Sequence, residues 1–289
     1  MIDLHTHTTA SDGTCAPAEL VDRAVSGGVR ILAVTDHDTT AGCDDAARAC
    51  ARAGIEFVAG IEITAIVDET DVHMLGYFVD PAAPSLESFL AEQRRVRVDR
   101  IRAMVDRLAQ LGMPLDLDAV LNPPGAAAAP AARAIGRPWI ARAMVRAGYV
   151  RTTSEAFDRW LGRGCPGFVS RMGAAPADVV GHIHRAGAIA SLAHPALLDR
   201  DDIIPSLVEA GLDALEAYHT DHTPADVDRY LRMASEAGIA VSGGSDFHGD
   251  DSHGGGGPGS VSLPREAYDA LKRRLATIRA TASGANTSS

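Results

Sequence analysis

Aromatic side chains are scarce in this chain: Phe, Trp and Tyr together make up 4% of its 289 residues. A hydrophobic core must therefore be built largely from Ala, Val, Leu and Ile. Positive charge is also in short supply, and the formal net charge is −11. That balance disfavours a polybasic surface for duplex nucleic acid or anionic lipid. A small anionic ligand stays open, because bound divalent cations invert the local field of an acidic pocket.

The sequence also lacks cysteine motifs and long apolar runs. The four cysteines, Cys15, Cys43, Cys50 and Cys165, form no C-x-x-C pair, which predicts buried small side chains or free thiols rather than a zinc site. No run approaches the roughly 18 apolar residues of a membrane-spanning helix, and no cationic stretch precedes an apolar one at the amino terminus. We therefore expect a cytoplasmic protein with no membrane partner.

Short apolar runs alternate with amphipathic stretches along most of the chain. The runs are rich in Ile, Leu and Val, as buried strands are, and the stretches between them have helical spacing. This alternation predicts an α/β fold with a parallel sheet and right-handed crossovers. Seven strands are expected, at residues 1–7, 30–36, 55–63, 72–79, 187–194, 213–219 and 239–248.

A long segment between residues 85 and 172 interrupts the alternation. Charged and apolar residues at helical spacing predict a long helix over 85–111, and two shorter helices follow it. We expect residues 85–172 to form a helical insertion that caps the substrate. The barrel domain would then comprise residues 1–84 and 173–289.

Two features of the segments outside the strands complete this outline. The Pro-rich segment 123–130 and the Gly-rich segment 254–259 are expected to be loops. The long helix carries many arginines, which we interpret as a solvated helix face. They are Arg94, Arg95, Arg97, Arg100, Arg102 and Arg107.

Metal-ligand side chains gather where the predicted strands end. The set comprises five histidines (His5, His7, His37, His194 and His248), two acids (Glu62 and Asp246), and His73, which opens a strand. In (β/α) barrels the carboxyl ends of the strands build the active site, so residues far apart in sequence meet at one mouth. Imidazoles suit Zn, Fe and Mn, and carboxylates favour Mn and Fe. The constellation therefore predicts a multi-metal centre.

Seven short motifs lie in order along the chain. They are His5-x-His7, Asp12-Gly13, Thr35-Asp36-His37-Asp38, Gly60-Ile-Glu62, His73, Ala193-His194-Pro195 and Gly244-Ser-Asp246-Phe-His248. In that order they resemble the motifs of the PHP (polymerase and histidinol phosphatase) family of phosphoesterases. More narrowly, the chain resembles the small stand-alone members that include 3′,5′-nucleotide bisphosphate phosphatases and the RNase AM-type exonuclease. The resemblance implies a distorted (β/α)7 TIM-like barrel, in agreement with the seven expected strands.

The resemblance also implies two to three divalent metal ions, Mn, Fe or Zn, held by three ligand sets. The first set comprises His5, His7, Glu62 and Asp246. Glu62 would bridge to a second set, completed by His73 and His194. The third comprises Asp12, His37 and His248. Some relatives have a histidine at the position of Asp12, so the acid here weakens the case for zinc at that ion.

A reaction follows from this arrangement of charges. Ions about 3.5–4 Å apart can share a hydroxide, because binding lowers the pKa of water toward neutrality. That hydroxide would attack a phosphate ester in line while the ions spread the developing negative charge. The catalytic candidates are His37, His194, His248 and Asp246, and any of the three histidines could protonate the leaving oxygen. Asp38 could orient the neighbouring imidazole or cap the next helix.

Cationic side chains outside the metal centre are candidates for binding substrate. Arg137 is similar to the phosphate-binding arginine of the family's insertion segment, and Arg171 occupies a comparable second position. A guanidinium can make two parallel hydrogen bonds to one phosphate. His222 and His219 follow the sixth predicted strand and could touch phosphate or base. The alternative for each of these residues is a solvent-facing surface position.

Together these features predict a metal-dependent phosphoesterase that hydrolyses phosphate monoesters of small anionic metabolites. Nucleotides such as 3′,5′-bisphosphonucleosides fit best, because two arginines beside the metal centre suit a second phosphate. Degradation of short RNA oligonucleotides from the 5′ end is an alternative, although aromatic residues for base stacking are few. A histidinol-phosphate-type phosphatase, a metal-dependent amide or lactone hydrolase, and a non-catalytic, metal-stabilised binding module also stay open.

Overall fold

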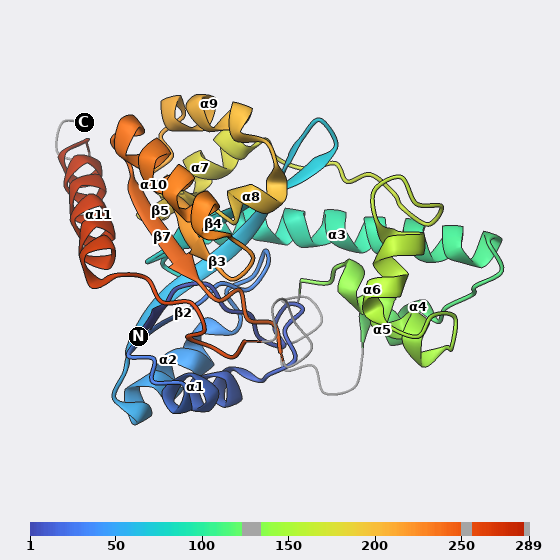
Figure 1. Ribbon diagram of the computed structural model, residues 1–289. Helices are drawn as coiled ribbons and strands as arrows, with labels where there is room; N and C mark the ends of the chain where they lie inside the picture. Colours follow the sequence, from blue (N-terminus) through green and yellow to red (C-terminus); the bar gives the residue numbers. More distant parts are fainter. Residues whose placement is uncertain (123–133, 250–255, 286–289) are drawn as a thin grey trace.

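The computed structural model of the chain describes residues 1–122, 134–249 and 256–285. The predicted loop at 123–130 and the first two residues of the one at 254–259 lie outside these ranges. Within them the chain forms a barrel from which a long helix runs to a separate group of helices (Figure 1). No helix in these ranges combines the length and the apolar character needed to cross a membrane.

The seven predicted strands are confirmed, and they form one sheet in sequence order. A parallel bridge between Thr6 and Phe247, together with a hydrogen bond from Leu4 N to Gly243 O, joins the first strand to the last. The sheet is therefore a nearly closed barrel, as predicted. Its strands are β1 (Ile2–Asp3), β2 (Ile31–Val34), β3 (Glu56–Val67), β4 (Thr70–Tyr77), β5 (Ile189–Leu192), β6 (Ala214–His219) and β7 (Ala240–Gly244).

The prediction of a wholly parallel sheet is wrong at β4, which runs antiparallel to both of its neighbours. β3 also continues past its predicted end, so Glu62 lies within the strand rather than at its end. Val67 pairs with Thr70, which leaves Asp68 and Glu69 as a two-residue turn. Both have positive φ, as the central residues of a type I′ hairpin turn do. A turn this short can join only antiparallel strands, whereas parallel strands need a long crossover.

Helices cover the outside of the barrel. They are α1 (Pro17–Ser26), α2 (Cys43–Ala53), α7 (Pro176–Arg185), α8 (Pro195–Leu198), a 3₁₀ turn (Asp201–Ile203), α9 (Ile204–Glu209), α10 (Pro224–Ala237) and α11 (Arg265–Ala285). The local sequence defines α10 at both ends. Thr223 and Asp226 form a reciprocal capping box at its start, and Gly238 ends it in the left-handed conformation.

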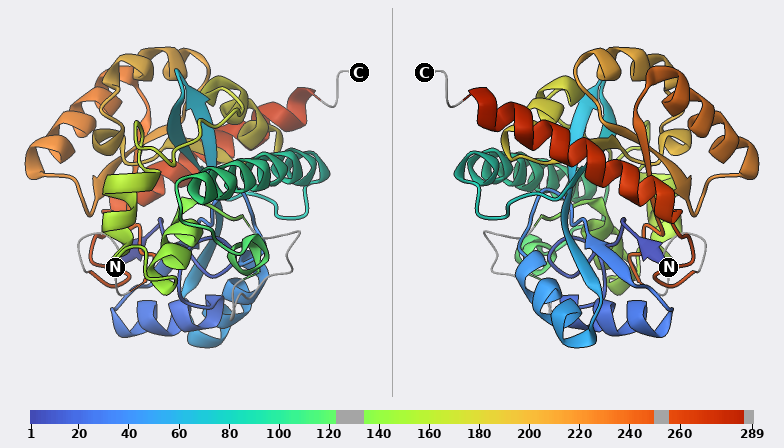
Figure 2. Two further views of the ribbon diagram at one scale, coloured as in Figure 1. Left: turned by 90° about the vertical axis from the view of Figure 1, so that its right-hand side faces the viewer. Right: turned by 90° about the vertical axis from the view of Figure 1, so that its left-hand side faces the viewer.

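The last helix, α11, closes the amino-terminal end of the barrel. Its Tyr268, Leu271 and Leu275 pack with Ile2 of β1 and Ile189 of β5, which stand at the beginnings of their strands. Figure 2 shows α11 crossing the strands at this end. Burial of each such side chain contributes about 1.5–3 kcal/mol to folding. With this end packed, the carboxyl ends of the parallel strands are left to form a site.

The helices between β4 and β5 have a hydrophobic core of their own. They are α3 (Pro84–Gln110), α4 (Leu117–Leu121), α5 (Arg137–Arg146), α6 (Thr153–Ala156) and a π-helical turn (Phe157–Leu161). Met104 and Leu108 of α3 pack there with Ile140 and Met144 of α5 and with Leu161. The predicted helical character of this segment is confirmed, while its boundaries at 85 and 172 as a capping domain stay a prediction.

Candidate metal centre

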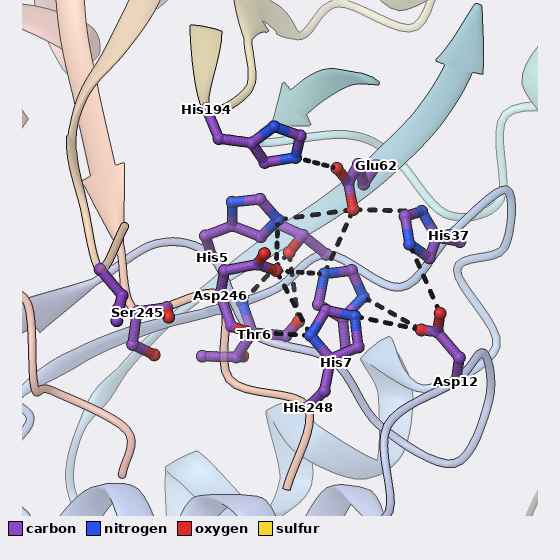
Figure 3. Close-up of polar contacts among 12 residues, drawn as sticks. His5, Thr6, His7, Asp12, His37, Glu62, His194, Ser245, Asp246 and His248 are labelled. Carbon is purple, nitrogen blue, oxygen red and sulfur yellow. Dashed lines mark hydrogen bonds and ion pairs between the residues drawn. The ribbon is translucent and has the colours of Figure 1, made fainter. Parts of the chain in front are cut away.

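The strand ends bring the predicted metal-ligand side chains together at one mouth of the barrel (Figure 3). Three residues at this mouth have positive φ although none is glycine: Asp38 (46°), His194 (26°) and Asp246 (51°). Such backbone costs on the order of 1–3 kcal/mol per residue and is typically found at functional sites. The chain therefore holds strained turns at three strand ends to aim these side chains.

Glu62 lies at the centre of the cluster. Its Oε1 is 2.8 Å from His73 Nδ1 and 3.3 Å from His194 Nε2. Its Oε2 faces three further ring nitrogens, those of His5 at 3.4 Å, His7 at 3.2 Å and His37 at 3.1 Å. The two oxygens of one carboxylate thus face different groups of imidazoles, as a bridging ligand would.

Asp246 completes a four-residue group with His5, His7 and Glu62. Asp246 Oδ1 lies 3.2 Å from His5 Nε2 and 3.1 Å from His7 Nε2. All four side chains are buried, and their ligand atoms lie within 4.8 Å of one another. This group is the first ligand set that the sequence predicts.

The converging atoms of this group lack hydrogen-bond partners within the described residues: His5 Nε2, His7 Nε2, Glu62 Oε2 and Asp246 Oδ1. Buried polar atoms are almost always satisfied, so a converging set of orphans needs another partner. Two imidazole nitrogens and two carboxylate oxygens are a donor set that suits Mn, Fe or Zn. The residues present therefore fit a divalent cation.

Two neighbouring groups extend the cluster toward the surface. Asp12 lies 3.3 Å from His248 Nε2, 3.7 Å from His37 Nε2 and 3.9 Å from His7 Nδ1. The predicted third set is thus brought together, with His7 as an additional neighbour. The predicted second set also meets, since His73 Nδ1 lies 3.3 Å from His194 Nε2 as well as beside Glu62.

The protonation states of the cluster follow from burial and from mutual charge. Burial would raise the pKa of Glu62, but the imidazoles that face its two oxygens together hold it well below its usual range. Burial lowers the pKa of His37 to about 3, which leaves the ring neutral as ligation requires. Burial also disfavours charge on His7, but Asp246 and Glu62 outweigh it and raise that pKa to about 10. Cation binding would therefore release protons from this centre.

A cavity of about 1010 Å³ opens over the cluster and is lined on its other side by the insertion. Both predicted substrate-binding arginines line it. Arg137 donates to Asp71 Oδ2 at 3.1 Å, and the buried Arg171 donates to Asp38 Oδ2 at 3.1 Å. The other candidate, His222, is not among the lining residues, and its Nδ1 donates to the carbonyl of Ala217 at 2.9 Å.

Two further arginines of α3, which were not among the predicted site residues, line the cavity. Arg97 donates to Asp38 and to Thr64 Oγ1, and Arg100 donates to Asp71 Oδ2 at 3.3 Å. The interpretation of the α3 arginines as a solvated face is therefore wrong for these two. It is also wrong for Arg94, which is only 6% exposed. Their spacing from the buried Ile101, Met104 and Leu108 was the available signal, because it places them on the inward face.

Asp38 performs neither of the two roles considered for it. Its carboxylate accepts hydrogen bonds from Thr64 N at 3.0 Å and from the two guanidiniums, and α2 begins only at Cys43. Burial would raise the pKa of Asp38, but Arg97 and Arg171 outweigh it and lower the value to about 2. Burial lowers the pKa of Arg171 to about 10, so the pair stays charged at neutral pH. Asp38 thus fixes two arginines at the cavity wall.

The chain is similar to proteins of known family over most of its length. The sequence profile of the PHP domain matches residues 3–105. A 3′,5′-nucleoside bisphosphate phosphatase from Chromobacterium violaceum is 35% identical over 256 residues, covering 86% of this chain and 87% of that protein. A 5′-3′ exoribonuclease from Haemophilus influenzae is 35% identical over 251 residues, covering 85% and 89%. A crystal structure from Bifidobacterium adolescentis, assigned as a metal-dependent phosphoesterase, superposes with a TM-score of 0.84 at 33% identity, covering 94% and 95%.

Proposed function

The chain belongs to the PHP family of metal-dependent phosphoesterases, and we propose that it hydrolyses phosphate monoesters of nucleotides that carry two phosphates, such as 3′,5′-bisphosphonucleosides. The observation that carries this proposal is the basic wall of the cavity. Four guanidiniums stand there opposite the metal-ligand cluster, held by only two carboxylates, those of Asp38 and Asp71. The wall keeps an excess of positive charge, which suits an anionic group beyond the one at the metal centre.

The nine side chains of the cluster would hold two to three divalent ions in the three sets described above. His5, His7, Glu62 and Asp246 would hold the first ion, and Glu62 would bridge to the second. When bound, such ions supply a water of near-neutral pKa and neutralise charge on the phosphoryl oxygens. The orphaned buried atoms support this assignment. Manganese or iron suits the carboxylate-rich sets, and zinc suits the imidazoles.

The chain's own residues would position the ester and move its protons. Arg137 and Arg171 would bind the second phosphate by charge-assisted hydrogen bonds. His37, His194, His248 and Asp246 line the same cavity, so each can reach a substrate bound there. His194 or His248 could instead, where it does not ligate an ion, donate a proton to the leaving oxygen, whereas the neutral ring of His37 suits ligation.

A second candidate, removal of nucleotides from the 5′ end of short RNA, is favoured by two more arginines along α5. Arg142 and Arg146 lie one helical turn apart and line the cavity, and Arg142 donates to the carbonyl of Asp12. Arg137 lines the same cavity, so the three guanidiniums together supply positive charge that could contact a sugar-phosphate backbone. The related exoribonuclease supports this alternative.

A hydrolysis screen on manganese-loaded protein, in which chromatography identifies the products of each substrate, tests these proposals. The panel comprises adenosine 3′,5′-bisphosphate, adenosine 5′-monophosphate, histidinol phosphate, a short 5′-phosphorylated RNA, and a neutral amide and lactone. The proposal expects the highest kcat/KM with the bisphosphate. Faster turnover of the short RNA would favour the second candidate. Turnover confined to histidinol phosphate or to the neutral substrates would refute both.

A further inference from the structure

Two buried side chains of β6 lie directly behind the proposed ligands, and neither belongs to the predicted ligand set. His5 Nδ1 is 2.9 Å from Glu216 Oε1 and 3.2 Å from its Oε2. His219 Nε2 is 3.4 Å from Asp246 Oδ2. Each contact uses the atoms that His5 and Asp246 turn away from the cluster, while His5 Nε2 and Asp246 Oδ1 are the orphaned atoms within it.

An irregularity in β6 brings Glu216 and His219 to the same side of the sheet. Residues three apart on a regular strand point to opposite faces. Here Glu216 pairs with Ser242 of β7 and Tyr218 pairs with Gly243, so two residues of β6 oppose one of β7. This β-bulge re-aims the side chains that follow it. Glu216 and His219 are consequently 0% and 3% exposed, whereas Tyr218 is half-buried.

The residue opposite the bulge has to be glycine. A Cβ on Gly243 would lie 2.5 Å from Cβ of Tyr218 and 2.7 Å from its carbonyl oxygen, both closer than van der Waals contact allows. Gly243 of β7 thus accommodates the irregular backbone that turns His219 inward.

The hydrogen bonds fix which ring nitrogens carry protons. A carboxylate can only accept, so His5 Nδ1 donates to Glu216, and Nε2 is the nitrogen left to face the cluster, where a bound cation would take its lone pair. Glu216 Oε2 also accepts from the backbone N–H of His194 at 2.8 Å, which holds that strained residue. Asp221 N–H donates to His219 Nδ1 at 3.1 Å, so the proton of the neutral ring is on Nε2 and points at Asp246.

These assignments argue against a separate cation site formed by His5, Glu216 and His219, although their atoms lie close enough to suggest one. The Nε2 of His219 carries a proton, and the Glu216 oxygens accept from two N–H donors. We propose instead that Glu216 and His219 are positioning residues, which hold His5 and Asp246 so that Nε2 and Oδ1 face a divalent cation. The inference rests on the ligand set given under Proposed function.

Glu216→Gln tests the first contact in the full-length protein. Gln keeps the shape of the side chain but offers one acceptor oxygen, so its NH₂ must face either the His5 ring or the His194 N–H. We expect Mn²⁺ affinity, measured from the EPR signal of the free ion, to fall roughly 10- to 100-fold, as is usual for residues that orient a metal ligand. In the Zn²⁺-loaded protein, imidazole ¹⁵N shifts should show the Nδ1–H of His5 in the wild type and a change of that signal in Glu216→Gln.

His219 supplies an independent pair of variants should Glu216→Gln fail to fold. His219→Phe removes the donor to Asp246 and should weaken Mn²⁺ binding, whereas His219→Gln restores an N–H near the same place and should recover most of the affinity. Asp213→Asn is the matched control, because Asp213 is a buried carboxylate that precedes β6 at the end remote from the cluster. Its Mn²⁺ affinity should equal that of the wild type.

The outcomes separate the two proposals. Unchanged Mn²⁺ affinity in Glu216→Gln or in His219→Phe would overturn the positioning role, as would a loss of equal size in Asp213→Asn or no recovery in His219→Gln. Absence of Mn²⁺ binding by the wild type would instead contradict the ligand set itself. Failure of the wild type to release phosphate from nucleotides would leave the affinity comparison intact.

Discussion

Glu62 Oε1 lies 2.8 Å from His73 Nδ1, although these residues are not partners in the sheet. Glu62 pairs with Leu75, and His73 pairs with Thr64, so the two are diagonal neighbours across the β3–β4 hairpin. Because β4 runs antiparallel, the beginning of this strand lies at the carboxyl ends of the parallel strands. The hairpin thereby delivers an imidazole to the Glu62 oxygen that His5 and His7 do not face.

The position of Glu62 between these imidazoles predicts the effect of removing its charge. Glu62→Gln should lower kcat on the order of 10²- to 10³-fold, because electrostatic stabilisation of the transition state is lost. Bound metal, counted by elemental analysis, should fall in parallel. Glu69→Gln at the exposed tip of the same hairpin is the control and should behave as wild type. Full activity of Glu62→Gln with its metal retained would refute a bridging role.

Removal of metal should destabilise the protein as well as inactivate it. A cation that binds only the folded state stabilises it by about 2.7 kcal/mol at a concentration 100 times its Kd. Dialysis against a chelator should therefore abolish phosphate release and lower the Tm, and added Mn²⁺ should restore both. Thermal unfolding followed by circular dichroism checks this. A Tm that is insensitive to both treatments would contradict a metal bound in the folded core.

The basic wall should matter more for substrates with two phosphates than for those with one. Arg137→Ala removes a charge-assisted hydrogen bond worth about 1.5–3 kcal/mol, so kcat/KM for a bisphosphonucleoside should fall roughly 10- to 100-fold. The loss should reside mainly in KM and should be small for the monophosphate. Arg95→Ala, on the exposed face of α3, is the control. Equal losses of kcat/KM with both substrates would show that Arg137 does not bind the second phosphate.

The buried carboxylate of Asp213, which lies away from the site, should make the free energy of unfolding depend on pH. It accepts from His184 Nε2 at 2.7 Å, Ala190 N at 3.0 Å and Arg274 Nε at 2.8 Å. Burial would raise the pKa of Asp213, but these donors outweigh it and hold the value below the ordinary one. The ionised form is thus favoured by folding, and its contribution is present above the unfolded pKa of about 3.9 and lost as the pH falls through the folded value.

Asp213→Asn should accordingly cost about 1–3 kcal/mol of unfolding free energy at pH 7. The difference from wild type should be constant down to about pH 5 and shrink below pH 4. Urea unfolding across this pH range measures it. A difference that grows as the pH falls would have the wrong sign for this account.

Much of the fold could be predicted because the strands are apolar runs with a regular βα spacing. The direction of β4 could not, since its hairpin turn, Asp68-Glu69, carries neither Gly nor Asn, the residues that usually signal a type I′ turn. The positions of Arg97 and Arg100 at the cavity wall could not be predicted either. A helix rich in charged residues is expected to face solvent. Here the barrel places Asp38 and Asp71 against the helix, and these partners are distant in sequence.

The metal-ligand residues were easier to foresee than the residues behind them. His5, His7, His194 and Asp246 follow apolar runs directly, so the carboxyl-end rule places them together. Glu216 sits within a strand, and only the bulge that follows it brings His219 to the same side of the sheet as Glu216. A bulge has no reliable signature in one sequence, so this pair emerges only from the structure.

Anomalous diffraction from crystals grown with manganese tests the central claim most directly, because it locates the metal without reference to activity. We expect a strong peak among His5 Nε2, His7 Nε2, Glu62 Oε2 and Asp246 Oδ1, and a second on the other side of Glu62 beside His73 and His194. A well-ordered barrel with no anomalous density among these side chains would contradict the account.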